Sequence, residues 1–133
     1  PVSIHKAIRE LKFFDGIVEQ ASEDEIANAA AWGDRAGLFS CPHTGVALAA
    51  TIKQLKNGPI TKDDRVVVIS TAHGLKFTDF KIDYFQNNLD GVETKFPNDP
   101  VEAPADYDVV EEKLFEELEK RQDQRKEGWD QWE

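Results

Sequence analysis

The pattern of apolar and polar positions predicts helices that alternate with short strands. Residues 4–11 place apolar side chains at three- and four-residue spacing, which is the spacing of one helix face, and Ser3 can cap this helix. Residues 22–25 read SEDE, a capping box that predicts a second, alanine-rich helix through about Trp32. The first quarter of the chain is therefore predicted to be largely helical.

Further helices are predicted along the rest of the chain. Pro42 fits the first turn of a helix, where its missing N–H costs nothing, and this helix would continue over residues 46–56, with small residues that allow close packing on a sheet. A short helix is predicted over residues 78–86. Apolar side chains at four-residue spacing over residues 110–118 predict one face of a C-terminal helix.

Three short apolar runs predict strands at residues 17–19, 38–39 and 65–69. The run from Val66 to Ile69 is too continuously apolar for a half-exposed strand, so we expect a buried, parallel one. Alternating helices and strands predict an α/β fold, with a partial parallel sheet flanked by helices and an acidic C-terminal helix. So few strands leave open edges, and we expect a protein partner, or several chains of a larger assembly, to complete the sheet.

Prolines and charge divide the chain. Three prolines at residues 97, 100 and 104 predict an extended connection over residues 94–108. This connection would separate an α/β portion, residues 1–93, from an acidic helix and tail, residues 109–133. Trp129 and Trp132 near the end could anchor a partner or be loose terminal aromatics.

Composition narrows the classes of protein. The net charge is −10, and residues 101–133 contribute −7 of it from 12 acidic and 5 basic residues, which argues against nucleic acid as a partner. No apolar run approaches the roughly 20 residues that span a bilayer. The lone Cys41 cannot form an internal disulfide, so we expect a soluble protein of a reducing compartment.

Two short segments carry candidate chemistry. Residues 40–45, SCPHTG, start a helix whose free N–H groups could hold an anion, and the helix field would favour a neutral His43. Residues 70–74, STAHG, follow the predicted buried strand, where open α/β proteins bind ligands. Gly74 would permit a close backbone approach or a positive φ. The alternatives are plain helix capping and an ordinary polar turn.

Other chemistries are weaker. Cys41, His43 and His73 could be drawn as zinc ligands, but their spacing fits no known zinc module and no fourth ligand is evident, so no metal site is predicted. Cys41 and His43 are two residues apart at a helix start and need not face each other, which disfavours a nucleophile and base. The glutamates of residues 111–119 are typical of a solvated helix face. No catalytic residue is assigned.

Taken together, these segments resemble the C-terminal part of plant-type threonine synthase, a pyridoxal-phosphate enzyme of the tryptophan-synthase-β-like fold (fold type II). The resemblance covers about residues 1–118, in the family's order and with near-family spacing. The matching stretches are PVSIHKAI at 1–8, GIVEQASEDE at 16–25, FSCPHTGVALAA at 39–50, DRVVVISTAHGLKFT at 64–78, KIDY at 81–84 and DPVEAPADYDVV at 99–110.

The resemblance implies roles for residues of both segments. In this family the threonine that corresponds to Thr71 hydrogen-bonds the pyridine nitrogen of the cofactor, which agrees with a hydroxyl serving a neutral ring nitrogen. The same resemblance implies that Ser70, His73 and Gly74 line the cofactor pocket. His43 and Thr44 would lie near it and face the substrate.

The resemblance also implies what this chain lacks. The family's Schiff-base lysine and phosphate-binding glycine loop lie upstream of the matched part, and Lys76 does not take that lysine's place. We therefore expect a lyase segment of threonine biosynthesis that binds pyridoxal 5′-phosphate only when completed, and that converts O-phosphohomoserine and water to threonine and phosphate only then. The alternative is a truncated relative reused as a non-catalytic structural subunit. A plastid stroma is the expected location, with the cytoplasm as the alternative.

Overall fold

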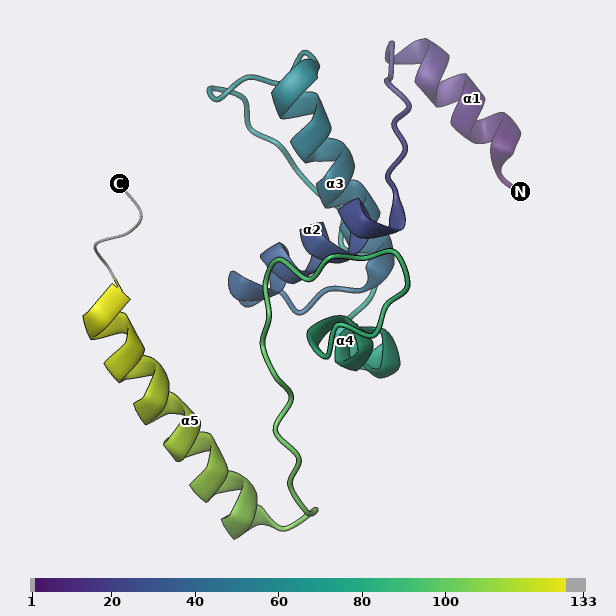
Figure 1. Cartoon of the computed structure of the whole chain (residues 1–133). Coiled ribbons are helices and arrows are strands. Elements are labelled where there is room, and N and C mark those ends of the chain that lie inside the picture. The colour runs from purple at the N-terminus through teal and green to yellow at the C-terminus, as the bar shows by residue number, and fades with distance from the viewer. Residues whose placement is uncertain (1, 129–133) are drawn as a thin grey trace. The chain divides into compact units, whose positions relative to one another are not determined.

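The computed structural model describes residues 2–128, with side chains through residue 120, and these residues form helices without a β-strand. The predicted anchors Trp129 and Trp132 lie outside the described residues. The chain divides into two compact units, Pro1–Asn98 and Asp99–Glu133, and the predicted divisions at residues 93 and 108 stay predictions. In chain order the helices of Figure 1 are α1 (Ile4–Phe13), α2 (Glu23–Arg35), α3 (Pro42–Asn57), the short 3-10 helix η1 (Gly74–Lys76), α4 (Thr78–Phe85) and α5 (Tyr107–Gly128).

The predicted helices are confirmed, and local chemistry explains where most of them begin. The Ser22 hydroxyl accepts from the Glu25 N–H at 3.3 Å, and the Glu25 carboxylate accepts from the Ser22 N–H at 2.8 Å, so the predicted capping box starts α2. Pro42 is the first residue of α3. Ser3 precedes α1 but makes no side-chain capping bond, so that part of the prediction is wrong.

The predicted parallel sheet is wrong for the described residues. Residues 17–19, 38–39 and 65–69 do not pair as strands, and the one bridge in the described chain is antiparallel, between Ser40 and His73. Val67 is 87% exposed and Ile69 73% exposed, so the run is not buried either. A strand needs a neighbouring strand for its backbone hydrogen bonds, and the backbone of this run makes no backbone hydrogen bond with another described segment.

The main helix–helix contact joins α2 and α3. A Cβ at Gly45 of α3 would lie 2.6 Å from the Ile26 carbonyl oxygen and 3.1 Å from Ala30 Cβ, so only glycine permits this approach. The small residues of α3 therefore pack on α2 rather than on the sheet that the sequence predicted. From the far end of α3, the chain returns through residues 58–70 to the start of the same helix (Figure 1).

Tyr84 of α4 is the centre of a second packed region. Its side chain is 1% exposed and packs against Ala27 and Ala31 of α2. Its hydroxyl donates to Asn28 Oδ1 at 2.8 Å and accepts from the Phe96 N–H at 3.2 Å. The partly buried side chains around this cluster are Phe80, Phe85, Leu89, Val92 and Phe96.

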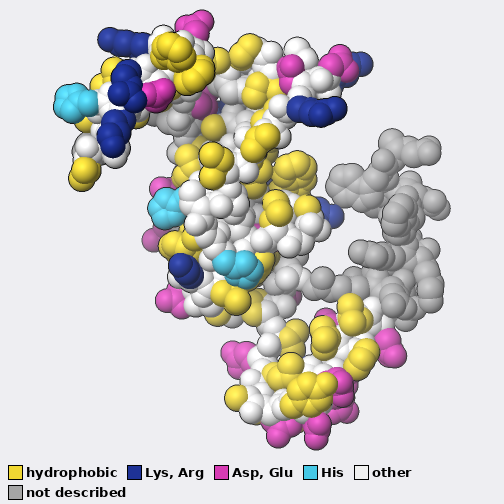
Figure 2. Space-filling model, turned by 180° about the vertical axis from the view of Figure 1, so that it is seen from behind, with side chains coloured by type: hydrophobic (Ala, Val, Ile, Leu, Met, Phe, Trp, Pro, Cys, Tyr) yellow, Lys and Arg dark blue, Asp and Glu magenta, His cyan; other side chains and the backbone are white. Residues whose placement is uncertain are grey.

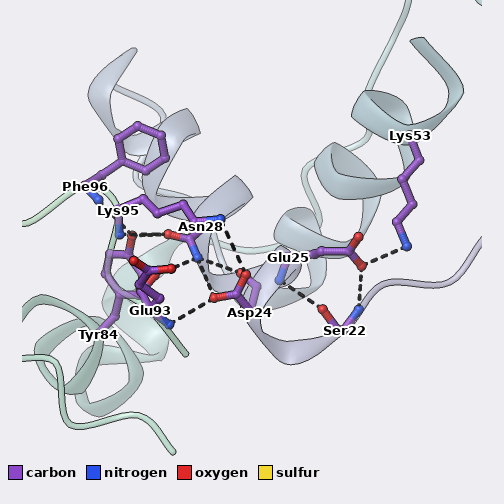
Figure 3. Close-up of polar contacts among 9 residues, drawn as sticks. All are labelled: Ser22, Asp24, Glu25, Asn28, Lys53, Tyr84, Glu93, Lys95 and Phe96. Atoms are coloured by element: carbon purple, nitrogen blue, oxygen red, sulfur yellow. Dashed lines mark hydrogen bonds and ion pairs between the residues drawn. The ribbon is translucent and has the colours of Figure 1, made fainter. Parts of the chain in front are cut away.

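Asn28 extends the same network to the segment that follows α4, as Figure 3 shows. Its Nδ2 donates to the Glu93 carbonyl at 3.0 Å, and its Oδ1 also accepts from the Lys95 N–H at 3.0 Å. The Asp24 carboxylate accepts from the Glu93 N–H at 3.0 Å. These bonds fix residues 93–96 to α2 and α4, because each satisfies a backbone group that would otherwise lose its partner.

Asp34, near the end of α2, forms a buried ion pair with Lys81 of α4. Asp34 Oδ2 lies 2.5 Å from Lys81 Nζ, and both side chains are less than a tenth exposed. Asp34 Oδ1 also accepts from the Ser40 N–H at 2.9 Å. The Lys81 ammonium lies 5.2 Å from the centre of the Phe39 ring. One carboxylate therefore connects α2, α4 and residues 39–40.

The second unit contains α5. Asp106 Oδ1 accepts from the N–H groups of Asp108 and Val109, at 3.1 and 3.3 Å, and so caps the helix. Its predicted apolar stripe is exposed: Val110, Leu114 and Leu118. None of the described helices combines the length and apolar character that crossing a bilayer requires.

Breaking the buried ion pair between Asp34 and Lys81 should strongly lower the stability of the fold. In Asp34→Asn the side-chain oxygen can still accept from Ser40, but Lys81 keeps a buried charge without its partner. We expect the free energy of unfolding in urea to fall by about 3–5 kcal/mol. The control is Glu10→Gln, which breaks the exposed pair with Arg9 and should change it by about 0.5 kcal/mol or less. Equal effects of the two substitutions would contradict the prediction.

Removing the Tyr84 hydroxyl should lower the stability of the fold and loosen the segment that it binds. Tyr84→Phe keeps the packed ring but leaves the Phe96 N–H without its acceptor and removes one of the two hydrogen bonds that Asn28 Oδ1 accepts. We expect unfolding free energy to fall by about 1–3 kcal/mol and amide exchange of residues 93–96 to accelerate. Tyr107→Phe is the matched control, because that hydroxyl bonds Glu111 on an exposed surface. Unchanged exchange at residues 93–96 would show that the hydroxyl does not hold this segment.

Candidate functional site

The two segments that the sequence singled out meet at the start of α3. The Cys41 N–H donates to the Ala72 carbonyl at 3.2 Å, and the Gly74 N–H donates to the Phe39 carbonyl at 2.7 Å. These two bonds form the antiparallel bridge between Ser40 and His73, and they hold residues 72–74 beside the start of the helix. The polar end of the apolar run therefore lies next to a helix N-terminus.

Gly74 makes this backbone approach possible. A Cβ at residue 74 would lie 2.9 Å from the Phe39 ring and 3.0 Å from the Phe39 carbonyl oxygen. Any residue other than glycine at position 74 would therefore force the backbone of the neighbouring segment to move. Gly74 was predicted to permit a close backbone approach or a positive φ, and the structure shows the close approach. Gly74 lies against the backbone of Phe39, so the approach joins the two segments.

A row of one thiol and three hydroxyl groups crosses the junction. Cys41 Sγ lies 3.3 Å from Thr44 Oγ1 and 3.7 Å from Thr71 Oγ1, and Thr44 Oγ1 lies 3.1 Å from Ser70 Oγ. Cys41 and Thr44 are 0% and 2% exposed, whereas Ser70 and Thr71 lie at the surface. The buried pair therefore supports an exposed pair of hydroxyl groups. We call these four residues the thiol–hydroxyl cluster.

The two histidines of the predicted site lie beside the cluster and are exposed, like every histidine in this chain (cyan in Figure 2). His73 Nδ1 accepts from the Leu75 N–H at 3.2 Å, so the side chain caps η1, and its ring centre lies 5.5 Å from that of Phe39. The His43 ring lies 5.8 Å from that of Phe77. Nδ1 of His73 is therefore an acceptor, which requires an unprotonated nitrogen there.

The hydrogen bonds of the cluster favour a thiolate. Burial raises the pKa of Cys41, but hydrogen bonds from the Thr44 side chain, the Thr44 N–H, Thr71 and His43 outweigh it and lower the pKa from 9.0 to about 6. Cys41 is also the N-cap residue of α3, where the free N–H groups of the helix favour negative charge. Within the part of the chain that the structure describes, no group of three or more His, Cys, Asp or Glu residues could hold a metal ion.

The sequence of this chain is similar, over most of its length, to known proteins. The chain is 49% identical, over 118 residues, to Threonine synthase 2, chloroplastic, of Arabidopsis thaliana; the match covers 89% of this chain and 23% of that protein. It is 28% identical to Threonine synthase of Methanocaldococcus jannaschii, over 87% of this chain and 26% of that protein. No family model matches the sequence.

The chain is a threonine synthase-like segment. It spans about a quarter of the length of the relatives it matches, a share that also holds for Threonine synthase of a Bacillus species, which is 32% identical over 68% of this chain and 25% of that protein.

Within the threonine synthase-like segment, the structure brings together the residues predicted for the site. Thr44, Ser70 and Thr71 are hydrogen-bonded through the cluster, while His43, His73 and Gly74 lie at its edges. The sequence reasoning missed the central position of Cys41, which it weighed only as a zinc ligand or nucleophile. The spacing of Cys41 and Thr44 at a helix start was the available signal, because residues three apart share a helix face.

The low pKa of Cys41 predicts a pH effect on the folded chain. Because the unfolded thiol titrates near its ordinary value of 9.0, the unfolded state binds more protons between pH 6 and 9, and folding stability should rise with pH across this window. The ultraviolet absorbance of the thiolate should appear with a midpoint near pH 6 in the folded chain. Cys41→Ala is the control, since it removes the sole thiol. A midpoint near 9 in the folded chain would contradict the prediction.

Proposed function

We propose that this chain forms one wall of the pyridoxal 5′-phosphate site of a threonine synthase, an enzyme that converts O-phosphohomoserine and water to threonine and phosphate. The observation that carries the proposal is the thiol–hydroxyl cluster at the junction of α3 and residues 70–74. Its two segments are the ones that carry the resemblance. The similarity to proteins named threonine synthase supports the same conclusion.

The chemistry of the donor groups fits the cofactor. The neutral hydroxyl of Thr71 is exposed, and it can donate to an unprotonated pyridine nitrogen, whereas a carboxylate there would favour the protonated ring. When bound, pyridoxal phosphate would supply the electron sink for the reaction. Ser70 and Gly74 would line the same pocket. The buried side chains of Cys41 and Thr44 would hold the hydroxyl groups of Thr71 and Ser70 in place.

The histidines and Thr44 would complete the wall. His43 is exposed at the first turn of α3, so it can reach a substrate group, while Thr44 is 2% exposed and acts through its bond to Ser70. His73 caps η1 and so fixes the turn after Thr71. These positions support binding and orientation. No proton transfer is assigned to them.

The exposed apolar run supports completion by a further part of the enzyme. Val67 and Ile69 present large apolar surfaces, and the backbone of residues 65–69 makes no backbone hydrogen bond among the described residues. Such a segment is suited to pairing with a strand supplied from elsewhere. We propose that the cofactor's lysine and phosphate loop come from that part, that the segment alone is inactive, and that the assembled enzyme works in a plastid stroma.

Replacing Thr71 tests the proposed cofactor contact. In a chimaera, residues of this chain replace the matching 118 residues of the Arabidopsis protein. Thr71→Val removes the donor while keeping the shape of the side chain, so the affinity for pyridoxal phosphate, measured by equilibrium dialysis, should fall about tenfold. Threonine formation should fall with it.

Thr78→Val is the matched control, because Thr78 is exposed on α4 outside the cluster, and it should leave affinity unchanged. If both variants bind the cofactor like the parent chimaera, the proposed contact is wrong. If the parent chimaera binds no pyridoxal phosphate and forms no threonine, the proposed function is wrong, and a structural subunit is the candidate function that is left.

A further inference from the structure

The thiol–hydroxyl cluster has a limited supply of hydrogens. Each of its three hydroxyl groups carries one, and Cys41 carries one as a thiol and none as a thiolate. The contacts link the groups in the order Ser70, Thr44, Cys41, Thr71. The protonation state of the sulfur therefore limits which way the hydrogens can point along the row.

A thiolate at Cys41 fixes every direction. The sulfur can then only accept, so the hydroxyl groups of Thr44 and Thr71 both donate to it. Because the hydrogen of Thr44 is used in this way, Ser70 must be the donor in its contact with Thr44. In this state the hydrogen of Thr71 points inward, and its exposed side offers lone pairs alone.

A thiol at Cys41 reverses the outer bond. The S–H can donate to Thr71 Oγ1, and the hydrogen of Thr71 is then free to point into the exposed side of the cluster. Cys41 Sγ is fully buried, so water does not substitute for either partner. The thiol state thus allows the exposed hydroxyl of Thr71 to donate outward, which the thiolate state does not.

We propose that Cys41 is a positioning residue whose proton decides whether Thr71 offers a hydrogen to an acceptor in the site. The identity of that acceptor rests on the proposed function, in which it is the unprotonated pyridine nitrogen of pyridoxal phosphate. Deprotonation of Cys41 and binding of such an acceptor compete for one hydrogen. By linkage, binding of the acceptor strengthens the hold of Cys41 on its proton.

Other titratable groups lie close to the cluster and set the design of the test. His43 lies on α3 and His73 on the turn after Thr71, and both side chains are exposed. The ion pair of Asp34 and Lys81 lies beneath Phe39. A pH effect is therefore assigned to Cys41 only as the difference between the parent protein and Cys41→Ser, which keeps a hydrogen-bonding group but does not titrate.

The first experiment measures the coupling without any cofactor. The ultraviolet absorbance of the thiolate is followed against pH in the chain and in Thr71→Val. Loss of the hydrogen donated to the sulfur should move the midpoint up by about one pH unit. Thr78→Val should leave the midpoint near pH 6. An unchanged midpoint in Thr71→Val overturns the proposal.

The second experiment measures pyridoxal phosphate affinity against pH in the chimaera by equilibrium dialysis. The parent should lose about tenfold in affinity relative to Cys41→Ser as pH rises past the thiol midpoint. Titration of the cofactor is common to both proteins and cancels. Cys41→Ala should remove the pH-dependent difference as well, while Thr71→Val should bind weakly at every pH.

The outcomes separate the two proposals. Parallel profiles of the parent and Cys41→Ser, with tight cofactor binding in both, overturn the role of Cys41 and leave the proposed function standing. A chimaera that binds no pyridoxal phosphate at any pH overturns the proposed function. The thiolate titration of the isolated chain then still decides whether Cys41 and Thr71 share a hydrogen.

Discussion

The geometry of the candidate site depends on one buried carboxylate. Asp34 pairs with Lys81 of α4 and accepts from the Ser40 N–H, so it holds residues 39–41 at the end of α2. Those residues in turn bond residues 72–74 through the Phe39 carbonyl and the Cys41 N–H. Because a buried charge is tolerated only with its partner, this connection is fixed in one geometry. Asp34 thereby positions residues 39–41 and, through them, residues 72–74 of the site.

The thiol–hydroxyl cluster shows how a helix start can be more than a capping site. Hydrogen bonds from Thr44 and Thr71 surround a fully buried sulfur and lower its pKa to about 6, although burial raises it. The same bonds connect that sulfur to hydroxyl groups at the surface. The protonation state of the buried Cys41 therefore affects the hydroxyl groups at the exposed face of the site, through the hydrogen bonds of the cluster.

The segment at residues 65–69 shows the limit of a local pattern. Its continuous apolar run was predicted to be a buried strand, and the side chains are largely exposed in this structure. The β-branched residues favour a strand only when a neighbouring strand pairs with the backbone and another layer covers the side chains. Both requirements are properties of a partner, so no pattern within these residues could report whether they are met.

The sequence by itself determined the helices and singled out the two segments that carry the candidate site. The capping box of Ser22 and Glu25 and the position of Pro42 each act over a few residues, and both were predicted from local chemistry. Only the tertiary structure decided that Asp34 would pair with Lys81 and that Cys41 would lie between Thr44 and Thr71. Those contacts join residues far apart in the chain, and the packing of α2, α3 and α4 sets their distances.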